Sequence, residues 1–373
     1  MKGLLVWACS NCRSVMALYR SLAKQLDVPL LVALWETPKG DGLDLRERTG
    51  FLKSEFADVQ MAVVGEDYQK GLELIDSHSG WHHLFCVYQG APTFRQLLFE
   101  VRRRGLRAGV MCESPCNMSS GLKSVVKRFY LKFILPTKIK PVIRSAEFFV
   151  SYSGDASRAA RSIGWPREKI IPFGYFPPPI VGSHFVQRRY TKDFTILTTG
   201  ILSRYRGADV LLRALVLLKA WGLNFKTYVT QTGELLPELQ KIAAENKLNV
   251  EFTGFLPLGE LIQLYQKCSV YVGTGRSEPW GMRLTDALHC GAPLIVSRGM
   301  GGVRLVDRYK CGLSFETDDE VDLANKIFEL ATRTDVYESA AICAVKASQA
   351  TMPDEQAKEL ISKIDRVVPG WFK

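Results

Sequence analysis

The sequence predicts an α/β protein with two domains, each built on a parallel β-sheet. Apolar runs without polar alternation recur at 3–8, 28–35 and 108–112, with helical patterns between many of them. The same order begins again at 194–198, after a proline-rich segment. Strands that are apolar along their whole length are typical of parallel sheets, because helices cover both faces. The 373 residues are enough for two domains with separate cores.

The first half of the chain is expected to carry six strands before a linker. These strands are predicted at 3–8, 28–35, 57–64, 83–88, 108–112 and 148–152, with helices at 15–26, 93–104 and 155–163. Three consecutive prolines, Pro177, Pro178 and Pro179, form a stiff spacer inside a linker predicted at 176–186. We therefore place the first domain at residues 1–176.

The second half repeats the alternation, and we place the second domain at residues 187–352. Strands are predicted at 194–198, 225–229, 250–252 and 268–273, with helices at 209–220, 258–267, 282–290, 321–331, 335–350 and 353–367. Open sheets of this kind bind ligands outside the carboxyl ends of their strands. The loops that follow the strands are therefore expected to carry the chemistry.

Composition is typical of a globular protein and argues against a membrane-spanning one. Hydrophobic residues make up 47% of the chain and charged residues 23%. Residues 1–8 resemble the start of a signal peptide, but polar residues at 10–13 interrupt the apolar run. No run approaches the roughly 18 apolar residues of a spanning helix. The nine cysteines are scattered singly through apolar segments, which predicts reduced thiols and a cytoplasmic location.

Residues 276–302 carry the strongest functional signal in the chain. A polar loop with Glu278 leads through Gly281 into the helix predicted at 282–290. A helix N-terminus after a glycine turn favours anions, phosphate above all. Asp286 lies eight residues after Glu278, where a carboxylate could accept ribose hydroxyls. The alternative is a buried strand–loop–helix unit whose surface glutamate is satisfied by neighbours.

This stretch resembles the donor-site signature of glycosyltransferase family 4, whose members are retaining, nucleotide-sugar-dependent enzymes of the GT-B fold. The match consists of Glu-Pro-Trp-Gly at 278–281, an acidic residue at 286, the run 290–297 and a Gly-Gly turn at 301–302. The family has a second glutamate where this chain has the shorter Asp286. The resemblance implies two Rossmann-like domains facing each other across a cleft. The first would bind the acceptor and the second the donor, with 353–373 packing back on the first.

A second part of the resemblance follows the first strand of the second domain. Residues 200–207 read Gly-Ile-Leu-Ser-Arg-Tyr-Arg-Gly and are similar to the family's phosphate loop, which has an arginine after the first glycine and a lysine before the second. Arg206 stands at the lysine position, and Ile201 at the arginine position. Arg204 is the candidate for the missing cation. A solvated basic turn is the alternative. Gly233 alone represents the family's next glycine turn.

The first domain offers three candidates in loops that follow predicted strands. Glu113 stands where the family often has a histidine near the donor sugar, and it is a candidate catalytic or acceptor contact. A loop carboxylate paired with a nearby arginine is the alternative. Ser10 and Asn11 are acceptor-side candidates by location. No Asp-x-Asp motif occurs, so no metal-bridged diphosphate, metal or cofactor is expected. A four-cysteine zinc site after two of these strands is a weaker alternative.

Positive charge is concentrated in residues 101–150, which hold 11 Lys and Arg against 2 Asp and Glu within a net charge of +11. Such a local excess predicts an anionic partner. Residues 122–135 form an amphipathic helical pattern, ended by Pro136, that predicts docking on an anionic membrane. A core helix with a solvated basic face is the alternative. The docking residues are Lys123, Lys127, Arg128 and Lys132, and the patch would be widened by Arg102, Arg103, Arg104 and Arg107.

The predicted function is that of a retaining, metal-independent glycosyltransferase in polysaccharide or glycolipid biosynthesis. It would move a sugar from a nucleotide diphosphate donor to a glycan or lipid-linked glycan. The resemblance implies that Glu278 holds sugar hydroxyls, that Asp286 binds ribose, and that Arg204, Arg206 and the Gly281–Met282 amides bind the diphosphate. Two alternatives are a nucleotide-sugar epimerase or hydrolase, and a non-catalytic nucleotide-sugar-binding protein. No nucleic acid partner is expected, because no basic surface with interleaved aromatic residues is evident.

Overall fold

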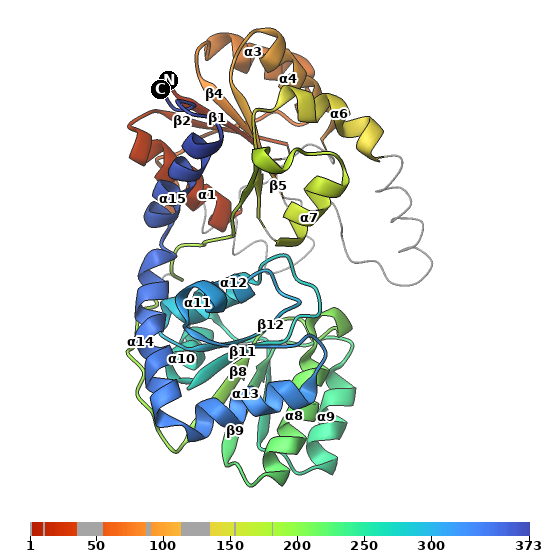
Figure 1. Ribbon diagram of the computed structural model, residues 1–373, viewed down its shortest axis with the longest axis vertical. Coiled ribbons are helices and arrows are strands. Elements are labelled where there is room, and N and C mark those ends of the chain that lie inside the picture. The colour runs from red at the N-terminus through yellow and green to blue at the C-terminus, as the bar shows by residue number, and fades with distance from the viewer. Residues whose placement is uncertain are drawn as a thin grey trace. The chain divides into compact units, whose positions relative to one another are not determined.

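The computed structural model describes residues 2–9, 12–35, 55–86, 91–112, 135–152, 154–180 and 182–373. The chain divides into two compact units, whose elements are labelled in Figure 1. Unit 1 comprises Met1–Pro178 together with Pro353–Lys373, and unit 2 comprises Pro179–Met352. The chain therefore leaves unit 1 at the proline-rich segment and returns to it for its last 21 residues.

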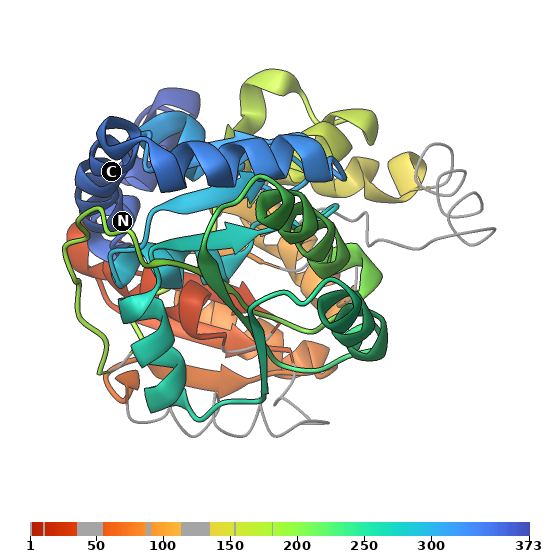
Figure 2. The same ribbon diagram turned by 90° about the horizontal axis from the view of Figure 1, so that it is seen from below.

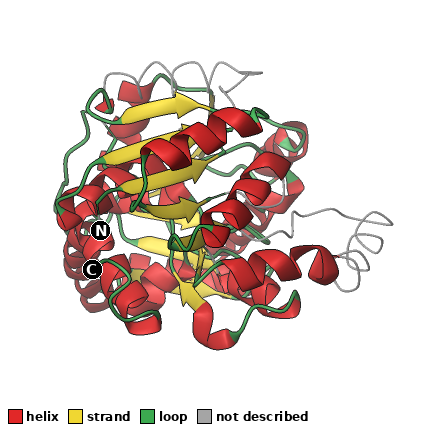
Figure 3. Ribbon diagram, turned by 90° about the horizontal axis from the view of Figure 1, so that it is seen from above, coloured by secondary structure: helices red, strands yellow, loops and turns green. Residues whose placement is uncertain are grey.

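Unit 1 is built on a parallel sheet with the strand order β3-β2-β1-β4-β5-β6-β7. Its strands are β1 (Leu4–Ala8), β2 (Leu30–Leu34), β3 (Gln60–Val63), β4 (His82–Phe85), β5 (Ala108–Cys112), β6 (Phe149–Ser151) and β7 (Ile170–Pro172). Its helices are α1 (Arg13–Leu26), α3 (Tyr68–Ser77), α4 (Pro92–Arg103), α6 (Leu135–Ser145), α7 (Gly154–Ser162), the short 3-10 helix η2 (Arg167–Lys169) and α15 (Pro353–Val367). Helices lie on both faces of the strands (Figure 3), which explains why β1 is buried along its whole length.

The C-terminal segment belongs to the core of unit 1. Helix α15 packs against α1, where Ser21 Oγ donates a hydrogen bond to Asp354 Oδ1 at 2.6 Å. Trp371 is fully buried, and its ring nitrogen donates to a carboxylate oxygen of Glu147. This segment therefore completes the unit that begins the chain.

Unit 2 is a second parallel sheet, with the strand order β10-β9-β8-β11-β12-β13. Its strands are β8 (Phe194–Thr198), β9 (Phe225–Thr230), β10 (Val250–Gly254), β11 (Val270–Gly273), β12 (Leu294–Ser297) and β13 (Gly312–Phe315). Its helices are η3 (Arg204–Arg206, 3-10), α8 (Ala208–Ala220), α9 (Leu236–Glu245), α10 (Leu258–Lys267), α11 (Met282–His289), α12 (Val303–Tyr309), α13 (Glu320–Thr332) and α14 (Thr334–Ala350). Helix α8 packs against α9 and α13, and α11 packs against α10 and α14 (Figure 2).

The two sheets confirm the predicted α/β class. Helix α6 has Pro136 in its first turn, where a proline costs no helical hydrogen bond, and Pro141 in its interior. Packing of α6 against α4, with Val142 fully buried, offsets the hydrogen bond that Pro141 cannot donate. Most of the helix predicted at 122–135 lies outside the described residues, so the structure does not test it. Within the described residues, no helix is both long and apolar enough to cross a bilayer.

Candidate functional site

A pocket lies in unit 2 at the carboxyl ends of β8 and β11. These two strands are neighbours in the sheet although they are far apart in sequence, so the strand order reverses between them. Thr198, the last residue of β8, and Gly273, the last residue of β11, both line the pocket. Such a switch point is the place where open α/β sheets bind ligands. The fold thus directs a ligand to the loops that follow β8 and β11.

An arginine and a carboxylate meet inside this pocket. Arg206 Nη1 donates a hydrogen bond to Glu278 Oε1, and the two side chains are only 23% and 14% exposed. Burial lowers the pKa of Arg206, but the charge of Glu278 and the hydrogen bond to it outweigh this and raise the pKa overall. Glu278 Oε2 lies against Gly275 and accepts no hydrogen bond from the described residues. Glu278 therefore keeps one oxygen for a ligand hydroxyl.

Backbone contacts fix the loop that carries Glu278. Its amide donates to Gly299 O at 3.0 Å, and its carbonyl accepts from Gly301 N at 2.8 Å. Gly281 caps the N-terminus of α11 with a φ of +90°, and a Cβ at this position would lie 2.5 Å from Met300 Cε. Glycine is needed for both reasons. The N-terminal amides of α11 consequently adjoin the pocket and suit an anion.

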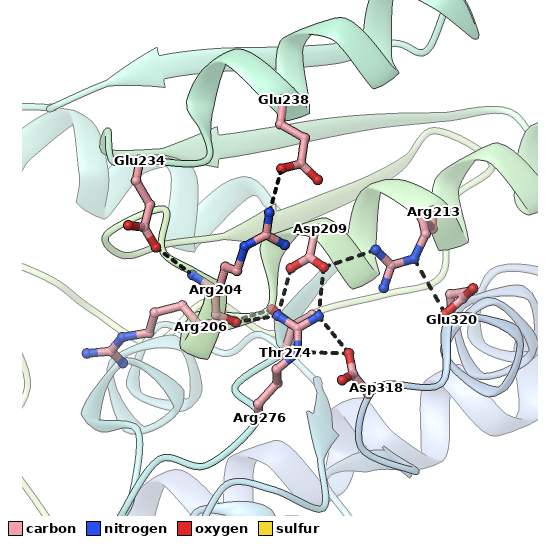
Figure 4. Close-up of polar contacts among 10 residues, drawn as sticks. All are labelled: Arg204, Arg206, Asp209, Arg213, Glu234, Glu238, Thr274, Arg276, Asp318 and Glu320. Carbon is pink, nitrogen blue, oxygen red and sulfur yellow. Dashed lines mark hydrogen bonds and ion pairs between the residues drawn. The ribbon is translucent and has the colours of Figure 1, made fainter. Parts of the chain in front are cut away.

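The turn that carries Arg206 is held in place by the loop after β11. The Arg276 amide donates to Tyr205 O at 2.9 Å, and Thr274 Oγ1 donates to Arg206 O at 2.8 Å. Arg276 Nη1 also donates to Arg204 O. Three successive carbonyls of η3 are thus bound by residues 274–276, so the two loops of the pocket form one hydrogen-bonded assembly (Figure 4).

The buried carboxylate of Asp209 holds this hydrogen-bonded assembly in place. Asp209, in the first turn of α8, accepts from Arg276 at 2.8 and 2.7 Å and from Arg213 at 3.0 Å. Burial raises the pKa of Asp209, but the hydrogen bonds from the two arginines outweigh it and lower the pKa. Arg276 also pairs with Asp318, which follows β13. The network therefore ties three strand-end loops together (Figure 4).

The predicted donor-side residues do not all line the pocket. Arg206, Glu278 and Gly281 line it, whereas Arg204, Met282 and Asp286 are not among its lining residues. The Arg204 guanidinium is 69% exposed and donates to Glu238 at 3.2 Å. Figure 4 shows its side chain pointing away from that of Arg206. Met282 and Asp286 are half-buried on α11.

Several predicted residues lie outside the described residues. These are Ser10, Asn11, Glu113, Lys123, Lys127, Arg128 and Lys132. The arginines expected to widen the basic patch are described, and each pairs with a carboxylate. Arg102 and Arg107 pair with Glu147, while Arg103 and Arg104 pair with Glu100. Their charges are therefore partly offset within unit 1.

Sequence reasoning missed several side chains that line the pocket. Arg283, in the first turn of α11, lines it together with Thr199 and Tyr271. Thr199 Oγ1 lies within hydrogen-bonding distance of the Tyr265 hydroxyl, at 3.1 Å, and of the Tyr271 hydroxyl, at 3.0 Å. The signal for Arg283 was a basic residue at the start of a helix that otherwise read as an anion site. Among the described residues, no group of three or more His, Cys, Asp or Glu side chains is placed to hold a metal ion.

Two Rossmann-like units in one chain define the class of fold, and solved structures agree with it. HepE of Anabaena, in complex with UDP and glucose, matches with a TM-score of 0.67 over 97% of this chain and 99% of that chain, at 15% identity. The apo form of the lipopolysaccharide outer core galactosyltransferase WaaB also matches with a TM-score of 0.67, over 98% and 99% of the two chains, at 12% identity. The protein has the GT-B fold.

Sequence comparison finds a family that unit 2 resembles. Residues 183–346 match the model of the glycosyl transferases group 1. An uncharacterized glycosyltransferase of Methanocaldococcus jannaschii is 31% identical over 137 residues, which are 36% of this chain and 37% of that protein. The match thus spans little more than a third of that relative. The family resemblance thus covers residues 183–346, which lie within unit 2.

Proposed function

We propose that this protein is a retaining, metal-independent glycosyltransferase of family 4 type. It transfers a sugar from a nucleoside diphosphate donor to a glycan or lipid-linked glycan. The observation that carries the proposal is the pocket at the β8–β11 switch point, which joins Arg206, Glu278 and the N-terminus of α11. A guanidinium and helix amides suit a diphosphate, and a carboxylate with a free oxygen suits sugar hydroxyls.

In this proposal the chain supplies charge and position rather than a nucleophile. Arg206 and the Gly281–Met282 amides bind the diphosphate and stabilise the negative charge that grows on the leaving phosphate. Glu278 holds sugar hydroxyls, and Asp286 accepts a ribose hydroxyl. The acceptor oxygen bonds to the anomeric carbon on the face that the phosphate leaves, and its proton passes to the departing phosphate. The nucleoside diphosphate is released, and the configuration of the sugar is retained.

The acceptor side of the proposal rests on the family resemblance and on strand ends in unit 1. In the sequence, Ser10 and Asn11 come after β1, and Glu113 comes after β5. The carboxyl ends of parallel strands are where open α/β sheets bind ligands. Ser10 and Asn11 are proposed to contact the acceptor. Glu113 is proposed to contact the acceptor or the transferred sugar.

A lipid-linked acceptor motivates the further proposal that the enzyme docks on an anionic membrane. Because the arginines of residues 102–107 are paired, docking depends on Lys123, Lys127, Arg128 and Lys132. Each exposed basic residue near an anionic surface contributes about 1 kcal/mol. The protein should sediment with anionic vesicles and not with neutral ones, and changing all four residues to Glu should leave it in the supernatant. Sedimentation of this folded variant with the vesicles would reject the docking helix.

Turnover with and without acceptor tests the proposed reaction. Purified protein is incubated with UDP-sugars, GDP-sugars and ADP-sugars, each with and without free and lipid-linked glycans. We expect release of nucleoside diphosphate that requires an acceptor, with NMR showing a product of retained anomeric configuration. Turnover of donor alone would favour the epimerase or hydrolase alternative. A nucleotide-induced rise in melting temperature without turnover of any donor would favour a binding protein.

A further inference from the structure

We propose that Arg283, from the first turn of α11, is the second cation of the diphosphate site. It would replace the arginine that the family carries directly after the first glycine of the phosphate loop, where this chain has Ile201. The inference rests on the proposed function, because it names a ligand contact in the same pocket. It differs from the sequence-based expectation, in which Arg204 supplied the missing charge.

The position of the Arg283 guanidinium is the first argument. It lies against Gly200, the residue directly before Ile201: a Cβ at Gly200 would be 2.9 Å from Arg283 Nη1 and 3.2 Å from Cζ. Gly200 has a φ of +126°, a conformation that suits glycine. Because Gly200 has no side chain, the Arg283 guanidinium can lie next to position 201, where the family has its arginine.

The charge balance of the pocket is the second argument. Three charged side chains line it in the described part of the chain: Arg206, Glu278 and Arg283, with a sum of +1. Arg206 is paired with Glu278. No ion pair of the described residues involves Arg283, so its charge is available to an anion. A second cation is what a diphosphate of two or more negative charges requires.

The Tyr271 hydroxyl does not neutralise Arg283. Tyr271 also lines the pocket, but burial raises its pKa to about 12, in spite of the opposing effect of the Arg283 charge, so it is a neutral phenol at physiological pH. Arg204 is not a rival for the ligand, because it pairs with Glu238 outside the pocket lining. Ile201 does line the pocket, is 51% exposed and brings no charge.

Two anion-binding features thus meet at one place. Arg283 belongs to the first turn of α11, whose N-terminal amides follow Gly281. A guanidinium next to helix amides can bind one phosphate group while Arg206 binds another. The site would then have two cations, as the family pattern has, although the second arginine comes from α11 and not from the phosphate loop.

Binding of nucleoside diphosphates and of the matching nucleosides tests this assignment. Calorimetric affinities for UDP, GDP and ADP are compared with those for uridine, guanosine and adenosine, using wild type, Arg283→Ala and Arg283→Lys. Arg333→Ala is the matched control, because Arg333 is an exposed arginine paired with Asp335 at the start of α14. We expect Arg283→Ala to weaken the best diphosphate by about tenfold to hundredfold, with nucleoside affinity unchanged. Arg283→Lys should recover part of the loss, and the control should match wild type.

A second variant separates a charge effect from a packing effect. Adding Ile201→Arg to Arg283→Ala should restore most of the diphosphate affinity, because it returns the cation to the family's position. Equal losses for diphosphate and nucleoside, no loss at all, or a double variant as weak as Arg283→Ala would each overturn the assignment. If wild type itself binds no nucleoside diphosphate, the proposed function fails along with it. If wild type binds a nucleoside diphosphate and Arg283→Ala binds it with the same affinity, only the assignment of Arg283 is overturned.

Discussion

The six strands of unit 2 follow the same order as the first six strands of unit 1, but the two units differ in the residues at the point where the strand order reverses. In unit 2 the ends of β8 and β11 carry the pocket with Arg206, Glu278 and Arg283. In unit 1 the corresponding strands are β1 and β4, and the described residues next to their ends are Cys9 and Cys86. The Cys86 thiol accepts a hydrogen bond from the Tyr19 hydroxyl at 2.8 Å, and burial raises its pKa to about 12. Cys86 is thus a neutral thiol at a position where unit 2 offers charge.

The comparison shows that the fold supplies the place and the loops supply the chemistry. Both sheets bury their central strands on two faces, so neither can hold charge there without a large cost. The loops after the strands are free of that restriction. Unit 2 uses them for a charged network held by Arg276 and Asp209, and this network keeps the Arg206 turn in shape.

The largest expected effect comes from removing the carboxylate of the pocket. Glu278→Ala should lower turnover by about 10²-fold to 10³-fold, because a lost charged contact to the reacting sugar costs about 2–4 kcal/mol in such sites. Diphosphate binding should survive, since Arg206 and the α11 amides remain. Steady-state kinetics with the best donor measure this. Glu251→Ala, which removes an exposed glutamate paired with Lys226 in the same unit, should turn over like wild type. If Glu278→Ala kept more than half of wild-type activity, the charged pocket that distinguishes unit 2 from unit 1 would not depend on Glu278 for the reaction.

The second-largest effect is expected from the loss of Arg276, which binds the buried Asp209. Arg276→Ala removes two hydrogen bonds to the buried Asp209, one to the Arg204 carbonyl and the ion pair with Asp318, so unit 2 should lose about 1–3 kcal/mol of stability. Affinity for nucleoside diphosphate should fall about tenfold, because the Arg206 turn loses its support. Chemical denaturation and calorimetry check the two effects. Arg213→Ala is the milder comparison, since Arg213 contacts Asp209 but not η3. Unchanged affinity in a destabilised Arg276→Ala would show that Arg276 serves the fold alone.

A smaller effect is expected in unit 1 on acidification. Burial is the largest cause that lowers the pKa of His82 to about 4, and the charge of Arg107 contributes to it. Burial, followed by the charge of His82, lowers the pKa of His83 to about 3. The unfolded chain, with histidine pKa values near 6.5, binds more protons below that pH. The free energy of unfolding therefore decreases as pH falls from about 6.5 towards these values, and is fully retained above it.

Melting curves at about pH 7 and pH 5 test this, followed by tryptophan fluorescence because Trp7 donates a hydrogen bond to His83 at 3.1 Å. A domain of this size loses about 2–4 °C per kcal/mol, so a fall of several degrees is expected. The variant with His82→Gln and His83→Gln should show a smaller difference between the two pH values. An equal difference in both proteins would mean that other groups cause the acid sensitivity.

The smallest effect belongs to the exposed arginine of the phosphate loop. Because Arg204 pairs with Glu238 at the surface, Arg204→Ala should change diphosphate affinity by less than about twofold. Calorimetry of this variant beside Arg283→Ala compares the two cations directly. A larger loss for Arg204→Ala would restore the cation assignment made from sequence spacing.

Much of the fold was predictable because apolar runs and helical patterns are local. The predicted helices at 258–267 and 353–367 coincide with α10 and α15, and the predicted strand at 194–198 coincides with β8. Short elements were missed: β12 and β13 have four residues each, and their identity depends on the strands beside them.

The sequence predicted those site residues that belong to a motif. It did not predict residues whose role depends on the orientation of the side chain. Glu278 and Arg206 come from motifs, and both line the pocket. Arg204 and Arg283 were equally basic in the sequence, but only the structure shows that one side chain leaves the pocket and the other lies against Gly200. Spacing along the chain does not determine which of two arginines reaches a shared ligand.

Hydrogen exchange with and without UDP tests the central claim most directly, which is that the switch point of unit 2 binds the nucleoside diphosphate. We predict that saturating UDP slows amide exchange in residues 199–207 and 274–284, the two loops that surround Arg206, Glu278 and Arg283. The strands of unit 2, already buried, should change little. Binding of UDP that leaves both loops at their free exchange rates would contradict the account.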